Sequence, residues 1–354
     1  MKSVFHLITT ISRGGAENQL LILVKEQIKQ GLEVHVVYLK GEPELRNDFE
    51  SSGAMVHSDL SKLFPLFQPI RFRSLIKGKN AIVHAHLPRA ELVALFTCTK
   101  FKFFVSRHNA EPFFPGAPIG ISNILSRIVE MRSRKIIAIS NAVKDFLVSR
   151  GEVSHLENIE VVHYGYHLRN EGKVPKANST DEILKLGTIS RLTLQKDIPT
   201  MLSAFLEYKV RARASSLSIL GAGTLNFELQ QISKQMGIEE SVFFLGRSPL
   251  IFDFLTGLDA FILTSKYEGF GMVLLEAMDA GIPVIASRNS AIPEVLGDDF
   301  PGLCTTGDSK DFCQKIELLN DPSYRKMILD KQSKRLKLFD AETMSQKIKK
   351  IYSL

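Results

Sequence analysis

The fold of this chain is indicated by the stretch Lys266–Met278, which reads KYEGFGMVLLEAM. An apolar run precedes it at 260–263 (AFIL), and another follows at 284–286 (VIA). The apolar residues between these runs recur with the period of a helix, Gly281 is a typical residue just past a helix end, and Pro283 opens the next run. We therefore expect a strand, a helix over 270–280 and a second strand parallel to the first.

The same alternation of strand and helix extends along the whole chain and predicts an α/β fold with two doubly wound, Rossmann-like domains. We expect an N-terminal domain over 1–168, a polar linker over 169–181, a C-terminal domain over 182–335 and a C-terminal helix over 336–354. The predicted strands of the first domain are 4–11, 34–39, 81–84, 103–105, 136–139 and 159–162. Those of the second are 183–189, 217–220, 242–245, 260–263 and 284–286, alternating with helices at 198–213, 225–236, 250–255 and 270–280.

The composition is that of an ordinary globular protein. Of the 354 residues 44% are hydrophobic and 23% are charged, which excludes a disordered or collagen-like chain. The three cysteines are scattered, so neither a disulfide framework nor a zinc site is indicated, and a reducing compartment, the cytoplasm, fits best. No run of about 18 apolar residues predicts a membrane span, and charged residues at 13 and 17 follow the first apolar run where a signal-peptide cleavage site would need small residues.

The quoted stretch also carries the strongest sign of a ligand site. Glu268 is expected in the loop at the carboxyl end of a strand, where open α/β sheets bind ligands, and Glu276 about two turns into the helix. The two carboxylates can therefore reach different parts of one extended ligand. The N–H groups of Phe270, Gly271, Met272 and Val273 would form a helix N-terminus suited to an anion such as a diphosphate.

The ordered set of motifs resembles glycosyltransferase family 4, the retaining nucleotide-sugar transferases of GT-B architecture. The resemblance covers nearly the whole chain, apart from 163–167 (HYGYH), where the family often has an Asn-Gly-Ile-Asp-like turn. The motifs are the two glutamates seven residues apart, GGAE at 14–17, GTISRL at 187–192 with Lys196, ILGAG at 219–223, FLG at 244–246, and GIPVIA at 281–286 with Glu294. The resemblance implies two domains facing each other across a cleft, with the C-terminal helix packing back toward the N-terminal domain.

The resemblance also implies roles for individual residues. Glu276 should bind the ribose hydroxyls of a nucleotide, and Glu268 the hydroxyls of the donor sugar. Arg191 and Lys196 should grip the diphosphate, and two fixed cations can stabilise a departing nucleoside diphosphate without a metal. Gly14 and Gly15 should approach the donor phosphates from the other domain. Their loop lacks the GxGxxG pattern of nicotinamide enzymes, which disfavours that class.

Two histidine strings end apolar runs of the first half, at 83–87 (VHAHL) and 106–109 (SRHN). In similar transferases a histidine at the second string lies beside donor sugar and acceptor, so we expect His108 to assist acceptor deprotonation or to orient the sugar. His86 suits a supporting contact with sugar or acceptor better than His84 does. A purely structural, hydrogen-bonded histidine is the alternative for each.

The net charge of +7 lies entirely in the first half, because residues 1–170 hold 22 Lys and Arg against 15 Asp and Glu, whereas residues 171–354 hold 23 of each. Region 62–107 mixes cations with aromatic residues, a composition typical of a peripheral membrane surface. We find no nucleic-acid-binding motif in it. Its cations are Lys62, Arg71, Arg73, Lys77, Lys79, Arg89, Lys100, Lys102 and Arg107. Exposed cations around a core that buries the aromatics are the alternative.

The main hypothesis is a retaining, metal-independent transferase that moves a hexose-type unit from a nucleoside diphosphate sugar to a growing, lipid-linked surface glycan. It would work in the cytoplasm at the inner face of the membrane. A nucleotide-sugar 2-epimerase of the same architecture and a non-catalytic sugar-nucleotide-binding protein are the alternatives. The base, sugar, acceptor and linkage stay open.

Overall fold

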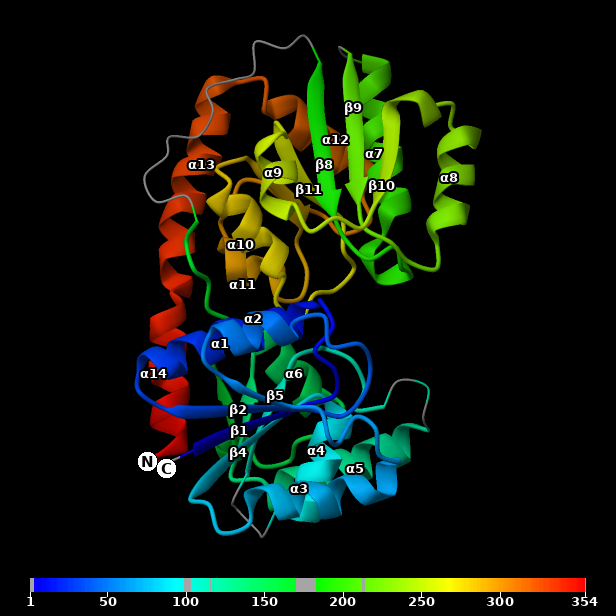
Figure 1. Ribbon diagram of the computed structural model, residues 1–354. Helices are drawn as coiled ribbons and strands as arrows, with labels where there is room; N and C mark the ends of the chain where they lie inside the picture. The colour runs from blue at the N-terminus through cyan, green and yellow to red at the C-terminus, as the bar shows by residue number, and fades with distance from the viewer. Residues whose placement is uncertain are drawn as a thin grey trace. The chain divides into compact units, whose positions relative to one another are not determined.

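The computed structural model describes residues 3–98, 103–114, 116, 118–169, 183–211 and 214–353. It divides into two compact units (Figure 1). Unit 1 comprises residues 1–167 together with 339–354, and unit 2 comprises 168–338. Most of the expected linker, from 170 to 181, lies outside the described residues.

Unit 1 is built on a parallel seven-stranded sheet in the order β3-β2-β1-β4-β5-β6-β7. The strands are β1 (Ser3–Ile8), β2 (Glu33–Tyr38), β3 (Met55–His57), β4 (Ala81–His86), β5 (Phe103–Arg107), β6 (Lys135–Ala138) and β7 (Ile159–Val161). The winding direction reverses between β1 and β4. The carboxyl ends of these two strands therefore mark the place where such sheets bind ligands.

Helices flank both faces of this sheet, with α1 and α2 on one face and α3 and α4 on the other (Figure 1). The α-helices of unit 1 are α1 (Gly15–Lys29), α2 (Arg46–Ser51), α3 (Gln68–Ile76), α4 (Pro88–Thr97), α5 (Ile119–Arg132), α6 (Asn141–Ser149) and α14 (Ala341–Tyr352). Short 3-10 turns η1 (Pro65–Phe67) and η2 (Leu156–Asn158) occur at element ends, and η5 (Lys337–Phe339) lies where the chain passes from unit 2 back to unit 1.

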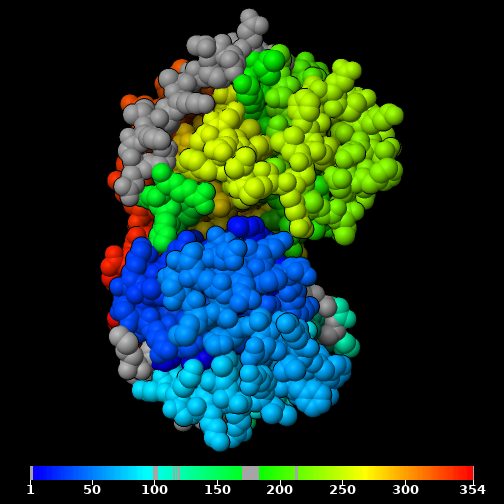
Figure 2. Space-filling model, in the orientation of Figure 1, coloured from blue at the N-terminus to red at the C-terminus, as the bar shows by residue number. Residues whose placement is uncertain are grey.

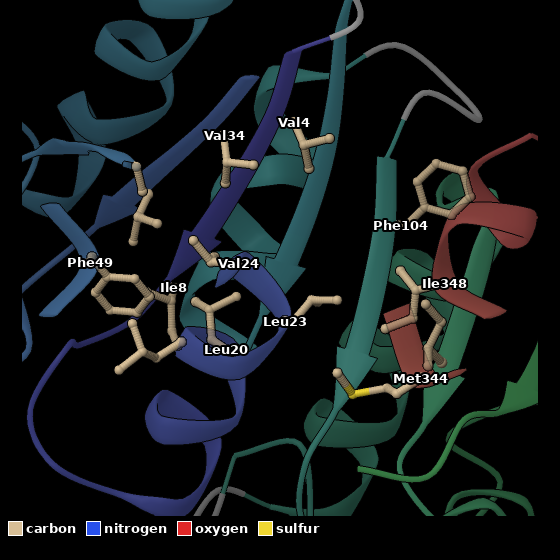
Figure 3. Packing of buried hydrophobic residues seen from close by; sticks show 14 of the residues in the cluster. Val4, Ile8, Leu20, Leu23, Val24, Val34, Phe49, Phe104, Met344 and Ile348 are labelled. Carbon is tan, nitrogen blue, oxygen red and sulfur yellow. The ribbon is translucent and has the colours of Figure 1, made fainter. Parts of the chain in front are cut away.

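The C-terminal helix α14 is part of the core of unit 1. It packs beside α1, and Figure 3 shows Met344 and Ile348 of α14 near Phe104 of β5. On the other side of the same cluster, Leu20, Leu23 and Val24 of α1 pack with residues of β1 and β2. Residues more than 300 positions apart in the sequence thus share one apolar core, and burying them is the main favourable term in the stability of such a core.

Unit 2 repeats the architecture with a parallel six-stranded sheet in the order β10-β9-β8-β11-β12-β13. Its strands are β8 (Leu184–Ile189), β9 (Ser215–Leu220), β10 (Val242–Gly246), β11 (Ala260–Leu263), β12 (Val284–Ser287) and β13 (Leu303–Cys304). Its α-helices are α7 (Ile198–Arg211), α8 (Asn226–Gln235), α9 (Ile251–Thr256), α10 (Met272–Asp279), α11 (Ile292–Leu296), α12 (Ser309–Leu318) and α13 (Pro322–Leu336). The 3-10 turns are η3 (Leu194–Lys196) and η4 (Glu239–Ser241). Here the winding reverses between β8 and β11.

The expected α/β class with two Rossmann-like units is confirmed. The expected strands are all present with small changes at their ends, and two short strands, β3 and β13, were missed. Within the described residues no helix is both long and apolar enough to cross a membrane. The three cysteines are all buried.

Candidate functional site

The β11–α10 junction of unit 2 differs in one detail from the expected helix over 270–280. Gly271 adopts a left-handed backbone conformation, with φ of 90°, and α10 begins only at Met272. Phe270 therefore lies in the loop with its side chain buried, instead of in the first turn. No described side chain caps the N-terminus of α10, so the N–H groups near Met272 and Val273 keep the orientation that suits an anion.

Glu268 lies in this loop and is 6% exposed. Its Oε1 accepts a hydrogen bond from Lys196 Nζ at 2.6 Å and another from Ser265 Oγ at 2.7 Å. The backbone carbonyl of Glu268 accepts from Ser290 Oγ at 2.7 Å. Lys196 and Glu268, which we expected to serve different parts of a ligand, thus form one ion pair whose side chains are 11% and 8% exposed.

The loop that carries Arg191 and Lys196 follows β8. It is hydrogen-bonded to the loop after the neighbouring strand β11. Thr264 Oγ1 donates to the backbone carbonyls of Lys196 and Asp197, each at 3.0 Å. Arg191 itself is exposed, and its Nη2 donates to Gln195 Oε1 at 3.3 Å. These hydrogen bonds bring Arg191, Lys196 and Glu268 together at the carboxyl ends of β8 and β11, where the winding reverses.

Gly221 and Gly223, in the loop that follows β9, support this arrangement. A Cβ on Gly221 would lie 1.8 Å from the carbonyl oxygen of Ser190, and one on Gly223 would lie 2.2 Å from that of Leu192. Leu192 N donates to the Ala222 carbonyl at 3.1 Å. The glycines of the ILGAG motif therefore allow close contact between two loops, and that contact positions the segment that carries Arg191.

Glu276 lies in the second turn of α10, partly buried. Burial raises the pKa of its carboxyl to about 7, and the nearby Arg169 opposes that rise. Its usual pKa is near 4.5. The carboxylate is thus poorly solvated in the free protein, and a hydroxyl donor would compensate for this loss of hydration.

In unit 1, Gly14 and Gly15 begin α1, and no described side chain caps this helix. Gly14 is extended, with φ of −155°, so its backbone does not require glycine. A Cβ there would instead lie 2.5 Å from Glu17 Oε2, whereas one on Gly15 would meet open space. Glu17 also accepts a hydrogen bond from Thr10 Oγ1 at 2.7 Å. A carboxylate thus lies at the helix terminus where we expected a phosphate.

The two expected histidines of unit 1 are in direct contact. His86 Nδ1 lies 3.0 Å from His108 Nε2, and His108 Nδ1 lies 2.5 Å from the hydroxyl of Tyr164. Both histidines are buried, and burial lowers the pKa of His108 to about 3 and that of His86 well below its usual value. His84 is buried as well, between Tyr352 and Ser106.

Sequence reasoning missed His6 and Gln27, which continue this contact from β1 and α1. His6 Nδ1 lies 3.0 Å from His86 Nε2, and His6 Nε2 lies 2.7 Å from Gln27 Oε1. The parallel register pairs His6 with His84 and Ile8 with His86 across β1 and β4. The available signal was a histidine in the first predicted strand, but only the strand order places it beside the others.

A pocket of about 100 Å³ adjoins His108 at the carboxyl ends of β4 and β5. Its wall includes Glu91 and Arg107, whose Oε2 and Nη2 lie 2.8 Å apart. Arg107 Nη1 lies 3.4 Å from Glu152 Oε2, and all three side chains are buried. Burial raises the pKa of Glu91 to about 7 in spite of Arg107. Arg107, expected in the basic surface, is therefore an interior ion-pair partner.

The rest of region 62–107 exposes both apolar and basic groups. Phe64, Leu66, Phe67 and Ile70 on η1 and α3 are 58–76% exposed. Lys62, Arg73, Lys77 and Lys79 are exposed beside them, whereas Arg71 pairs with Asp59 at 2.6 Å. This segment, light blue in Figure 2, lies at the surface of unit 1. Phe72, Phe103 and Phe104 are core residues, and Lys100 and Lys102 lie outside the described residues.

Comparisons with known proteins agree along the whole chain. A model of Glycosyltransferase Family 4 matches residues 13–170, and one of glycosyl transferases group 1 matches 171–335. A 4-alpha-N-acetylgalactosaminyltransferase of Campylobacter jejuni, named for an N-acetylgalactosamine-N,N'-diacetylbacillosaminyl-diphospho-undecaprenol substrate, is 22% identical over 96% of both chains. N-acetyl-alpha-D-glucosaminyl L-malate synthase of Bacillus anthracis is 27% identical over 68% of this chain and 65% of its own length. Anabaena HepE, solved with UDP and glucose, superposes with a TM-score of 0.83 at 20% identity, covering 100% of this chain and 99% of HepE.

Proposed function

The chain belongs to the GT-B glycosyltransferases of family 4, and we propose that it is a retaining enzyme acting on a nucleoside diphosphate sugar. It would move a hexose-type unit to a hydroxyl of a growing, lipid-linked surface glycan such as lipopolysaccharide, O-antigen, capsule or exopolysaccharide. The observation that carries the proposal is the grouping of Arg191, Lys196 and Glu268 where the winding of the unit 2 sheet reverses.

The donor would be held mainly by unit 2. The carboxyl of Glu276 would accept hydrogen bonds from the ribose hydroxyls, and Glu268 would accept from hydroxyls of the sugar. The diphosphate would lie at the N-terminus of α10, with Arg191 and Lys196 as its cations. The structure with UDP and glucose makes a uridine nucleotide the first to test.

Catalysis would depend chiefly on stabilising the leaving diphosphate. Negative charge builds up on that group as the bond to the sugar breaks, and fixed N–H groups and cations in a partly buried site stabilise it strongly. Because these groups come from the protein, we propose that no metal ion is required. His108, in contact with His86, would have an orienting role on the acceptor side, next to the pocket bounded by Glu91 and Arg107. Gly14 and Gly15 would contact the donor phosphates.

The acceptor is proposed to be lipid-linked because the surface segment of η1 and α3 combines the residue types that bind a membrane surface. Its exposed apolar side chains can enter the interface while neighbouring cations bind anionic headgroups. The enzyme would then work in the cytoplasm as a peripheral protein at the inner face of the membrane. The relative with an undecaprenol-linked substrate supports this choice. The relative named for malate favours a small soluble hydroxy acid as the second candidate acceptor.

Nucleotide selectivity gives the first test. UDP, GDP and ADP would be compared by thermal shift, and one of them is expected to stabilise the protein, since a ligand at 100 times its Kd contributes about 2.7 kcal/mol. The double variant Arg191→Ala, Lys196→Ala should lose this stabilisation and most sugar transfer. Lys234→Ala, an exposed lysine of α8, is the matched control. Turnover within a factor of two of wild type in the double variant would contradict the mechanism.

Product analysis separates the alternatives. A 2-epimerase would convert its sugar nucleotide without any acceptor, and a binding protein would retain it unchanged. A transferase releases the nucleoside diphosphate in proportion to a glycosylated product, and NMR of the new linkage shows whether the anomeric configuration is retained. Equal rates with and without EDTA are expected if no metal takes part.

Membrane contact is tested by sedimentation with vesicles of phosphatidylglycerol and phosphatidylcholine. Phe64→Ser, Phe67→Ser and Ile70→Ser together should release the protein into the supernatant without changing nucleotide affinity, as should Arg73→Glu with Lys77→Glu. Phe227→Ser is the control, because Phe227 is 73% exposed on unit 2. If both sets of variants sediment as wild type does, the excess of basic residues in unit 1 serves solubility and not membrane binding.

A further inference from the structure

A continuous chain of buried hydrogen bonds crosses the sheet of unit 1. It begins at Gln27 on α1, passes through His6 on β1, His86 on β4 and His108 after β5, and ends at Tyr164 after β7. The four links measure 2.7, 3.0, 3.0 and 2.5 Å in that order. Every member is buried.

With its oxygen placed toward His6, the amide of Gln27 gives one direction to every bond in this chain, and the opposite placement would reverse them all. Its Oε1 can only accept, so His6 Nε2 must carry the proton. A neutral imidazole has one N–H, so His6 Nδ1 then accepts from His86 Nε2. By the same rule His86 Nδ1 accepts from His108 Nε2, and His108 Nδ1 accepts from the hydroxyl of Tyr164. All three histidines therefore share the Nε2–H tautomer.

A second branch from the same amide is consistent with this orientation. Gln27 Nε2 donates to the Tyr352 hydroxyl at 3.4 Å, and this hydroxyl therefore gives its own proton to His84 Nδ1 at 2.7 Å. His84 Nε2 then donates to Ser106 Oγ at 2.8 Å. Both branches are satisfied by one placement of the amide, with its oxygen toward His6 and its nitrogen toward Tyr352 of α14.

Burial keeps both branches uncharged. It lowers the pKa of His6 to about 4 and that of His108 to about 3, and it lowers the pKa values of His84 and His86 well below their usual value. Burial raises the pKa values of the neighbouring phenols Tyr164 and Tyr352, and the nearby Glu17 carboxylate raises that of Tyr164 further. The donor and acceptor roles derived above for neutral rings therefore hold at neutral pH.

His6, His84 and His86 also form a candidate metal group in the described part of the chain, with one nitrogen from each within 4.8 Å of the others. A metal would need nitrogens of all three rings about 2.1 Å from one point. All six ring nitrogens already have hydrogen-bond partners at 2.7–3.0 Å. Metal binding would break several of these bonds, so we favour the hydrogen-bonded chain.

We propose that Gln27 is a positioning residue that fixes the tautomer of His108 through His6 and His86, and that His108 orients Tyr164 instead of acting as a general base. His108 Nε2 donates to His86 and its Nδ1 receives the Tyr164 proton, so both ring nitrogens are engaged inside the protein. The expected effect on catalysis rests on the proposed function, whereas the assignment of the tautomers does not depend on it.

The tautomers are tested by long-range ¹H–¹⁵N NMR of the full-length protein labelled at histidine, which distinguishes Nδ1–H from Nε2–H rings. Signals of His6, His86 and His108 would be assigned by single replacement of each residue. We expect all three as neutral Nε2–H rings from pH 5.5 to pH 9. An Nδ1–H ring, or a ring that titrates in this range, would overturn the proposal.

Gln27→Met removes the oxygen that determines the orientation, and Gln19→Met is its matched control. Gln19 lies two turns earlier on α1, is equally buried, and contacts Gly165 and Met344. Gln27→Met should produce a mixture of tautomers and lower kcat for transfer from UDP-glucose about tenfold with KM unchanged, while Gln19→Met leaves the tautomers as in wild type. Gln27→Glu keeps an acceptor for His6, so His6, His86 and His108 should have the same tautomers as in wild type. His84 should change to the Nδ1–H tautomer.

The two proposals fail in different ways. If Gln27→Met leaves the tautomers and kcat unchanged, Gln27 does not position His108, while the glycosyltransferase proposal is unaffected. If wild type transfers no sugar from any nucleoside diphosphate sugar whose nucleotide stabilises the protein, the proposed function fails. The NMR result still decides the tautomers in that case. If Gln27→Met proves too unstable to study, the tautomers of Gln27→Glu decide the question.

Discussion

Glu276→Gln is expected to make the free protein more stable at pH 8 but not at pH 5. Burial in the second turn of α10 raises the pKa of Glu276 from 4.5 to about 7, against the opposing effect of Arg169. The folded state thus binds a proton more tightly than the unfolded state does. Stability is therefore complete below about pH 4.5, falls as the pH rises, and has lost the full contribution above about pH 7.

The size of the effect follows from this difference in pKa. At about 1.4 kcal/mol for each pKa unit, the rise from 4.5 to about 7 corresponds to an upper limit of about 3.5 kcal/mol. The side chain is only partly buried, so solvent reduces this figure, and we expect about 1–2 kcal/mol. For a unit of this size that is a rise in Tm of about 3–6 °C. Glutamine does not ionise and avoids the loss.

The assay is thermal unfolding of wild type, Glu276→Gln and Glu240→Gln at pH 5, 6, 7 and 8. Glu240 is an exposed carboxylate in the same unit and serves as the control. The gain of Glu276→Gln should increase between pH 5 and pH 7 and then level off. A constant gain across this range, or an equal rise for Glu240→Gln, would refute the reasoning. The variant should also lose stabilisation by UDP if Glu276 binds the ribose.

Three further substitutions test residues that support the candidate site residues and the core of unit 1. Gly223→Ala places a Cβ 2.2 Å from the Leu192 carbonyl oxygen, so it should cost about 1–3 kcal/mol and weaken UDP binding in calorimetry by displacing the adjoining loop. Arg107→Met leaves two buried glutamates without their cation and should cost about 3–5 kcal/mol in urea unfolding. Met344→Ala should destabilise unit 1 by about 2–5 kcal/mol, whereas Leu338→Ala, at a residue 62% exposed, should change Tm little.

The strands were predictable from the sequence because most of them are short runs of buried apolar residues, which a parallel sheet covered on both faces requires. β3 and β13 were missed for a physical reason. They have three and two residues, and β3 is only partly buried, so neither produces a recognisable run. The late start of α10 was missed because the left-handed conformation of Gly271 delays the helix, although its apolar period begins at Phe270.

The sequence indicated individual candidate residues, but not which of them contact one another. The structure extends β4 to His86, so His84 and His86 lie on one face of the strand. Their contact with His6 depends on β1 lying next to β4, although some 75 residues separate the two strands in sequence. Arg107 looked like a surface cation because its partners, Glu91 and Glu152, come from other elements. Long-range pairing of this kind follows from strand order, which local periodicity does not contain.

The ion pair between Lys196 and Glu268 couples two tasks that the sequence suggested were separate. A cation with only 11% exposure would be costly without a partner, so Glu268 stabilises this part of the fold. An ammonium group has three N–H donors, and one of them is used by Glu268 Oε1 at 2.6 Å. Lys196 can therefore bind a phosphate oxygen while it keeps Glu268. In the proposed function Glu268→Gln would then weaken binding of the diphosphate as well as of the sugar, because Lys196 would lose the carboxylate that positions it.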